Sequence, residues 1–255
     1  EEHTDNIITS LEHKTENPLD FEITDEEIQN GLSSLKSNKS SGTDSIINEM
    51  LKYGAPQLIQ PFKKLFNLLL QSGHFPQQWS QSTLVPIYKS GETSNPTNYR
   101  GIAISSCVGK LFTFILNKRL QYFLESSNLL SPFQSGFRKD FRTSDNVFVL
   151  KTLIDQQTSK PGGKLYTCFI DFRKAFDSIW RNGLFYKLLS SGIGGNFFSI
   201  IKSMYHNIEY CVKTPHGLSP YFQSLCGVRQ GCNLSPLLFN LFINDFPSLL
   251  DPTSC

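Results

Sequence analysis

The residues best placed to do chemistry surround Asp171, at the end of an apolar run. Leu165 to Ile170 is short and rich in aromatic and β-branched residues, a pattern that predicts a buried strand ending at Asp171. A carboxylate held rigidly at a strand end suits a hard cation such as Mg²⁺, and the adjacent Arg173-Lys174 pair could neutralise phosphate. The alternative, left open by this segment alone, is that Asp171 caps the following turn.

A second candidate site lies between Gly227 and Pro236, where glycines flank an Arg229-Gln230 pair just before an apolar helix. A guanidinium and an amide beside free backbone N–H groups can bind sugar and phosphate. Seen alone, the segment also fits an ordinary loop followed by a helix cap.

A third segment carries two bases, Lys89 and Arg100, on a predicted strand and the loop that follows it. They could grip phosphates, or they could simply be solvated. The strand, Thr83 to Tyr88, is predicted to lie at a sheet edge because Pro86 cannot donate to a ladder.

Helical periodicity and cap signals predict the elements that position these segments. A capping box of Thr24 and Glu27 predicts the start of the ordered domain. Ser235 is predicted as the N-cap of the last helix, with Pro236 at its first position. Helices are further predicted over about 44–53, 56–72, 107–126, 144–158, 183–191 and 195–205, with a hairpin-like pair over 208–214 and 220–226. Mixed helices and strands without a βαβ repeat indicate the α+β class.

The net charge of +2 conceals two opposite parts. Residues 1–30 carry ten acids and one base, a charge of −9, whereas residues 31–255 carry 23 bases and 12 acids, a charge of +11. A basic body favours a polyanionic partner, although a solvated lysine-rich surface is the alternative.

The six cysteines contain no C-x-x-C pair, which argues against a structural zinc site or a disulfide framework. The acidic N-terminal residues lack the features of a secretory signal, and no apolar run approaches the ~20 residues that span a bilayer. We therefore expect a soluble protein without a membrane partner, in the reducing setting of the nucleus or cytoplasm.

Taken in order along the chain, these segments resemble the reverse transcriptase domain of non-LTR (LINE-type) retrotransposons. The resemblance runs from about Ser37 to Asp245, and six motifs in order are far more specific than any one. The segments that carry it are Asn38 to Asp44, Val85 to Gly91, Asn98 to Ile102, Gln134 to Arg138, Phe169 to Ser178 and Gly227 to Leu237.

The resemblance implies the right-hand polymerase fold, with fingers, a partial palm and no thumb in this chain. Residues 1–22 are expected to be a flexible acidic leader, 23–160 the fingers and 161–255 the partial palm. The partners implied are an RNA template, a DNA primer and deoxynucleoside triphosphates.

The same resemblance assigns roles to individual residues. Asp171 matches a ligand of the catalytic metals, helped by the backbone carbonyl of Phe172, and Phe176 matches the steric gate that excludes a ribose 2′-OH. The remaining matches are Gln230 and Gly231, which pack on the incoming nucleotide; Lys89 and Arg100, which contact its triphosphate; and, on weaker grounds, Lys110, Phe137 and Arg138, which contact the template.

Two-metal phosphoryl transfer with Mg²⁺ needs several carboxylates around ions ~3.5–4 Å apart. The family supplies the others from an Ala-Asp-Asp box, and no Asp-Asp pair occurs in this sequence. Two hypotheses follow: a fragment of an RNA-directed DNA polymerase that is active in its complete form, or a catalytically inactive nucleic-acid-binding remnant. For the chain as it stands, the missing carboxylates favour inactivity.

Overall fold

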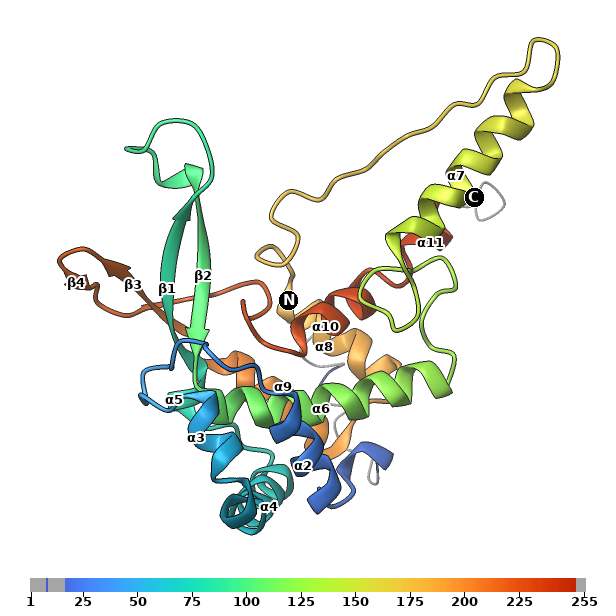
Figure 1. Cartoon of the computed structure of the whole chain (residues 1–255). Coiled ribbons are helices and arrows are strands. Elements are labelled where there is room, and N and C mark those ends of the chain that lie inside the picture. Colours follow the sequence, from blue (N-terminus) through green and yellow to red (C-terminus); the bar gives the residue numbers. More distant parts are fainter. Residues whose placement is uncertain (1–7, 9–16, 251–255) are drawn as a thin grey trace.

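The computed structural model describes residue 8 and residues 17–250, and Figure 1 shows their arrangement. Helices predominate, and one mixed sheet accompanies them, in agreement with the α+β class predicted from the sequence. The helical elements are η1 (Pro18–Asp20), α2 (Asp25–Ser34), α3 (Asn48–Tyr53), α4 (Ala55–Ser72), α5 (Gln77–Ser80), η2 (Pro96–Asn98), α6 (Cys107–Ser126), α7 (Thr143–Thr158), α8 (Arg181–Ser190), α9 (Gly195–His206), α10 (Ser235–Phe242) and α11 (Phe246–Leu249). The strands are β1 (Gln81–Tyr88), β2 (Tyr99–Ser105), β3 (Glu209–Thr214), β4 (Gly217–Leu218) and β5 (Phe222–Gln223).

The body of the molecule is a layer of helices around α6, whose apolar face is buried along its whole length. Helix α2 packs on both α6 and α4, and α9 packs on α4. Phe66 of α4 meets Phe112 of α6, with ring centroids 5.1 Å apart. The predicted capping box is present: Thr24 Oγ1 accepts from Glu27 N at 3.2 Å, and Glu27 Oε2 accepts from Thr24 N at 2.9 Å. Helix α4 ends, as predicted, at Gly73, which has a φ of +63°.

Strand β1 lies inside the sheet for half of its length, so its prediction as an edge strand is only partly right. It pairs antiparallel with β2 over its length and parallel with β3 from Gln81 to Leu84. Pro86 lies beyond the part of β1 that pairs with β3, so its missing N–H costs no hydrogen bond to β3. The sheet order is β2-β1-β3-β4, with β5 also pairing β3.

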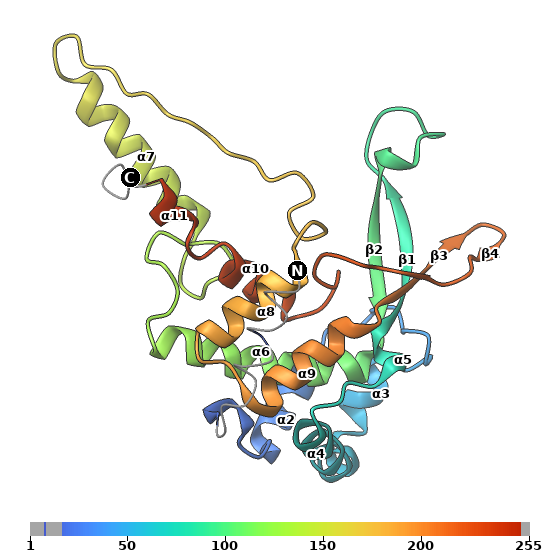
Figure 2. The same ribbon diagram turned by 180° about the vertical axis from the view of Figure 1, so that it is seen from behind.

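The segment predicted as a buried strand, Leu165 to Ile170, is not a strand in the structure. It is part of an irregular connection that returns from the far end of α7 to the body, as both ribbon views show (Figures 1 and 2). Tyr166 and Phe169 are 86% and 80% exposed. The prediction failed because a strand needs a hydrogen-bonding neighbour, and the described residues place none beside this segment.

The ordered part of the chain begins before Thr24. Residues 1–7 and 9–16 lie outside the described residues, but residues 17–22, which were assigned to a flexible leader, pack on the body. Leu19 is buried, and Arg119 of α6 donates to the carbonyl oxygens of Leu19 and Glu22 at 3.2 and 3.0 Å. Asp20 accepts from the N–H groups of Asn196 and Phe197 at the start of α9, so this segment joins two helices.

The last predicted helix is present, but its N-cap lies one residue earlier than predicted. Leu234 is the N-cap, and Ser235 is the first helical residue. The Ser235 hydroxyl donates to the Arg229 carbonyl at 2.6 Å instead of capping the helix. Across the described residues, no helix is both long and apolar enough to cross a membrane.

Candidate functional site

The two segments singled out first, around Asp171 and around Gln230, are bonded to each other. The N–H groups of Gly227 and Val228 donate to the carbonyl oxygens of Ile179 and Phe176, each at 2.8 Å. Gly227 has a φ of +80°, and a Cβ there would lie 2.6 Å from the carbonyl oxygen of Asp177. Only glycine permits both the backbone conformation and the close approach.

The Gln230-Gly231 pair lies between this junction and strand β2. Gln230 Nε2 donates to Asp177 Oδ1 at 2.7 Å. A Cβ on Gly231, whose φ is +76°, would lie 3.0 Å from the carbonyl oxygen of Ala103, and a Cβ on Gly101 would lie 3.8 Å from Gln230 Oε1. The Gln230 carboxamide thus bonds to a carboxylate on one side and lies beside a glycine of the sheet on the other.

Arg229 does not offer its guanidinium to a ligand, contrary to the prediction from its position beside Gln230. It is 5% exposed, donates to the Trp79 carbonyl, and lies 5.2 Å from the centre of the Phe75 ring. Burial of the apolar stem and pairing of the charge make Arg229 an anchor for the loop, because an unpaired guanidinium would be costly at that depth.

Arg181 is a second anchor, which the sequence reasoning missed. It donates to the carbonyl oxygens of Gly227 and Cys226, both at 3.0 Å, and to that of Tyr205 at 3.2 Å. Burial lowers the pKa of this guanidinium. No local pattern distinguishes Arg181 from a solvated arginine, because its partners come from distant segments.

Phe176 lies in an aromatic cluster formed by three elements. Its ring stacks on Phe239 of α10, with centroids 4.9 Å apart and planes 23° from parallel. Phe137 meets the same ring edge-on at 5.8 Å and 86°. Both geometries are favourable for aromatic pairs, so the ring of Phe176 is held on two sides.

Phe137 owes its place to a turn that is tightly held. Asn240 of α10 is fully buried, accepts from Gln134 Nε2 at 3.0 Å and donates to the Gly136 carbonyl at 2.6 Å. Asn240 is a further residue that sequence reasoning missed, although an amide within the apolar Leu237–Phe242 run was a visible signal.

Arg138, predicted as a template contact, is engaged by the protein itself. Its guanidinium forms a two-point ion pair with Glu125, at 3.0 and 2.6 Å, and donates to the Ser131 carbonyl at 2.9 Å. These contacts argue against a direct role in template binding and for a role in holding the turn before Phe137. The backbone carbonyl of Lys110, another predicted template contact, accepts from Asn233 Nδ2 at 3.0 Å.

Asp171 and Phe172 lie on the irregular connection between α7 and α8. Asp171 is exposed, and the Phe172 ring meets Phe246 at 5.5 Å and 70°. Among the described residues, no group of three or more His, Cys, Asp or Glu side chains is placed to hold a metal ion. One carboxylate and one backbone carbonyl fit only part of the oxygen shell that Mg²⁺ requires.

Lys89 and Arg100 are exposed on the β1–β2 hairpin, which projects from the body (Figure 1). The register sets Arg100 opposite Ile87, and alternation along the strand places Lys89 on the same face. Gly101, beside Gln230, belongs to the other face. The structure therefore places both bases on the face of the hairpin that is turned away from Gln230.

Comparison with known proteins identifies the family. A family described as "Reverse transcriptase (RNA-dependent DNA polymerase)" matches residues 87–254. The chain belongs to the reverse transcriptase family.

Curated relatives agree with this assignment. The chain is 30% identical over 87% of its length to a probable RNA-directed DNA polymerase from transposon BS of Drosophila melanogaster, of which it covers 24%. It is 27% identical over 89% of its length to the RNA-directed DNA polymerase from mobile element jockey of the same species, covering 25% of it. It is 30% identical over 75% of its length to a Pol polyprotein of the R2 element of Popillia japonica, covering 26%.

These relatives confirm the predicted resemblance to reverse transcriptases of non-LTR retrotransposons. The chain spans about a quarter of the length of these curated relatives.

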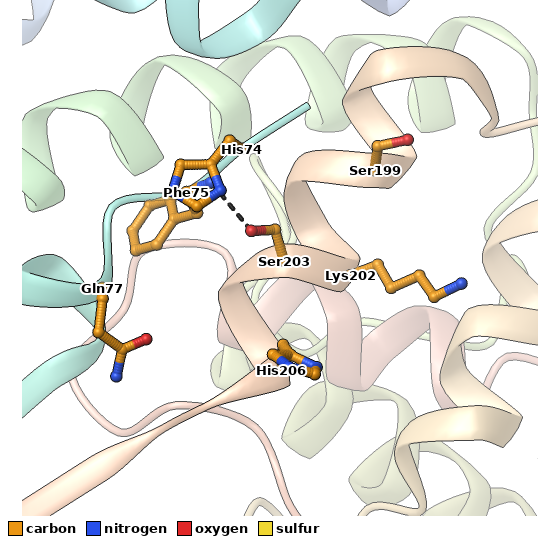
Figure 3. Close-up of a pocket in the computed structure, with 7 residues that line it drawn as sticks. All are labelled: His74, Phe75, Gln77, Ser199, Lys202, Ser203 and His206. Carbon is orange, nitrogen blue, oxygen red and sulfur yellow. Dashed lines mark hydrogen bonds between the residues drawn. The ribbon is translucent and has the colours of Figure 1, made fainter. Parts of the chain in front are cut away.

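Two pockets among the described residues of this reverse transcriptase domain lie away from the motifs. A pocket of about 380 Å³ lies between residues 74–77, which follow α4, and one face of α9. Figure 3 shows the residues that line it. There the Phe75 N–H donates to Ser203 Oγ at 3.0 Å, and His74, Lys202 and His206 line the rim. A larger hollow of about 820 Å³ lies between residues 128–133 and 244–250. Neither is lined by Asp171, Phe176 or Gln230.

Proposed function

We propose that this chain is the fingers and the beginning of the palm of an RNA-directed DNA polymerase of a non-LTR retrotransposon. Residues 23–160 form the fingers, preceded by the ordered segment 17–22, and residues 161–255 form part of the palm. The observation that carries the proposal is the junction between the Asp171 and Gln230 segments. Gln230 and Asp177 are 53 residues apart in the chain, and the junction unites two of the segments that matched the family.

The junction supports a site for a deoxynucleoside triphosphate. The carboxamide of Gln230 and the backbone at Gly231 form one wall against which the nucleotide packs. Phe176 is the gate that a ribose 2′-OH would strike. Since Arg229 and Arg181 anchor the loop in the body, this wall is preorganised and needs little ordering when the nucleotide binds.

The proposed metal site is built on Asp171 and the backbone carbonyl of Phe172. Bound Mg²⁺ would supply the positive charge that activates the primer 3′-oxygen and stabilises the leaving phosphate. Because these two groups fit only part of the shell, we propose that the remaining ligands lie outside the described residues. Arg173 and Lys174, exposed beside Asp171, would neutralise phosphate charge.

Lys89 and Arg100 are proposed to contact the triphosphate. They share the face of the hairpin opposite to Gln230, so a nucleotide packed on Gln230 must reach them around the hairpin edge. Phe137 and Lys110 are proposed near the template, and Arg138 supports Phe137.

The deciding experiment is primer extension on an RNA template with Mg²⁺ or Mn²⁺. It is run with this chain and with the full-length protein encoded by the same reading frame, each beside an Asp171→Ala variant. Asp155→Ala serves as the control, because Asp155 is an exposed carboxylate on α7 whose salt-bridge partner is Lys151. We expect Asp171→Ala to abolish DNA synthesis by the full-length protein and Asp155→Ala to leave it intact. Equal synthesis by both variants would contradict the proposal.

A second candidate function is binding of a primer–template without catalysis, which the +11 charge of residues 31–255 favours. For duplex DNA, each phosphate neutralised adds about −0.9 to the slope of log affinity against log salt. A steep slope for this chain, measured by fluorescence anisotropy, is expected. A flat response would exclude the basic surface as a nucleic-acid interface.

A further inference from the structure

The segment of Phe176 holds the backbone of this residue but does not by itself hold its ring. Residues 173–178 form a turn in which the N–H groups of Asp177 and Ser178 donate to the Lys174 carbonyl at 2.9 and 3.0 Å. Lys174 has a φ of +51°, and the Phe176 carbonyl accepts from the N–H of Val228. A side chain on such a turn can rotate or shift unless neighbouring groups hold it.

Phe239 holds that ring from a rigid element. It lies on α10, whose neighbouring side chains Leu238 and Leu241 are buried in the core. Its ring stacks over one face of Phe176, whereas Phe137, which is exposed and lies on a loop, meets only the edge. The stack is therefore the firmer of the two contacts.

The same helix follows the nucleotide wall. Gln230 and Gly231 precede α10 directly, and the Ser235 hydroxyl bonds back to the Arg229 carbonyl at 2.6 Å. Because the loop that carries the wall is bonded to the first residue of the helix that carries the support of the gate, the separation of wall and gate is held constant. That separation is what decides whether a 2′-OH fits.

We propose that Phe239 is a positioning residue for sugar selection, acting through the ring of Phe176. The proposal rests on the polymerase function proposed above. Removing the stacked ring frees Phe176 to move away from the sugar, so ribonucleotides are admitted although the gate residue is still present. A displacement of about 1 Å can change a rate by as much as ~10²-fold. We expect discrimination between deoxy- and ribonucleotides to fall by about tenfold or more.

The test measures kcat/KM for a deoxynucleotide and the matching ribonucleotide with the full-length polymerase that carries this chain. The variants are Phe239→Ala, Phe239→Leu, which keeps apolar bulk without a flat ring, and Phe176→Ala. Phe242→Leu is the matched control, because Phe242 is a half-buried ring on the same helix that lies near Lys187 and not near Phe176. The ratio of the two values is taken on one preparation, so a smaller folded fraction does not alter it.

Loss of discrimination in Phe239→Leu and Phe176→Ala, with Phe242→Leu unchanged, supports the proposal. Loss in Phe176→Ala alone overturns it while leaving the gate in place. Unchanged selectivity in Phe176→Ala overturns the gate assignment and this proposal together. Absence of Asp171-dependent synthesis overturns the polymerase function itself, which is a distinct result.

Discussion

Two regions are rich in apolar residues: residues 227–242, which include α10, and the arm formed by α7 and the turn after it, residues 143–163. Only the first is embedded in the body. Leu237, Leu238 and Leu241 of α10 are buried, and two arginines tie the preceding loop to distant carbonyl groups. Within the described residues, α7 has no buried side chain, and Phe148 is 71% exposed. The contrast shows that apolar composition predicts only that burial would be favourable. Whether burial occurs depends on the segments that pack against the helix.

Hydrogen exchange should show the largest difference between the two regions. Amides of α10 are expected to exchange only through large-scale opening, at a free energy approaching the global stability, which is about 5–15 kcal/mol for a typical domain. Amides of α7 should exchange through local fraying, with a free energy of opening near zero, because an isolated helix of this length is marginally stable in water. Exchange followed by mass spectrometry on peptides from each helix measures this. Equal protection would mean that something in solution covers α7.

A matched pair of leucines tests the packing difference. Leu238→Ala is expected to lower the free energy of unfolding by about 2–5 kcal/mol, because Leu238 is fully buried. Leu153→Ala on α7 should cost no more than about 0.5 kcal/mol, since Leu153 is exposed. Urea titration followed by circular dichroism gives both values. A large loss for Leu153→Ala would place that side chain in a buried contact.

Gly227 and Gly162 both have a positive φ, and they allow the packing around the backbone to be compared between the two regions. Gly227→Ala combines a left-handed strain of about 1–2 kcal/mol with a clash against the Asp177 backbone, and overpacking adds a further ~1–3 kcal/mol. Gly162, at the end of the arm, has a φ of +70° and open space around its Cβ position, so Gly162→Ala should show the strain alone. Thermal unfolding of both variants separates the two contributions, and indistinguishable Tm values would contradict the close approach at Gly227.

The smallest expected effect is a pH dependence at the ion pair between Lys187 of α8 and Asp245. The hydrogen bond from Lys187 lowers the pKa of Asp245 below its usual value of 3.8. A lowered carboxyl pKa gives stability that is present above the unfolded-state pKa and is lost as the pH falls through the folded-state pKa. Because Asp245 is 65% exposed, the contribution is screened and should stay below about 1 kcal/mol.

Asp245→Asn should therefore be less stable than the parent at pH 7, by less than about 1 kcal/mol, and this difference should vanish as the pH falls from about 5 to about 2. Denaturant midpoints across that range provide the measurement. A variant whose stability falls in parallel with the parent at every pH would show that the pair does not contribute.

Local signals predicted the elements whose partners lie nearby in the chain. The capping box at Thr24 and the helices predicted over 56–72 and 107–126 are all present, because each depends on contacts within a few residues or on one helical face. The predicted strand at Leu165 to Ile170 is absent, because a strand depends on a neighbour that no local pattern guarantees.

The candidate site divides in the same way. The types and order of its residues were enough to predict the reverse transcriptase family, which the comparisons confirm. They did not predict that Arg229 is an anchor, that Arg138 is paired with Glu125, or that Arg181 and Asn240 hold the site together. Side-chain chemistry is a property of the residue, so the family could be recognised from the sequence. Whether a charge faces solvent or a partner depends on other segments, which lie from 13 residues away for Arg138 and Glu125 to 150 residues away for Arg229 and Trp79. Only the tertiary structure decides that.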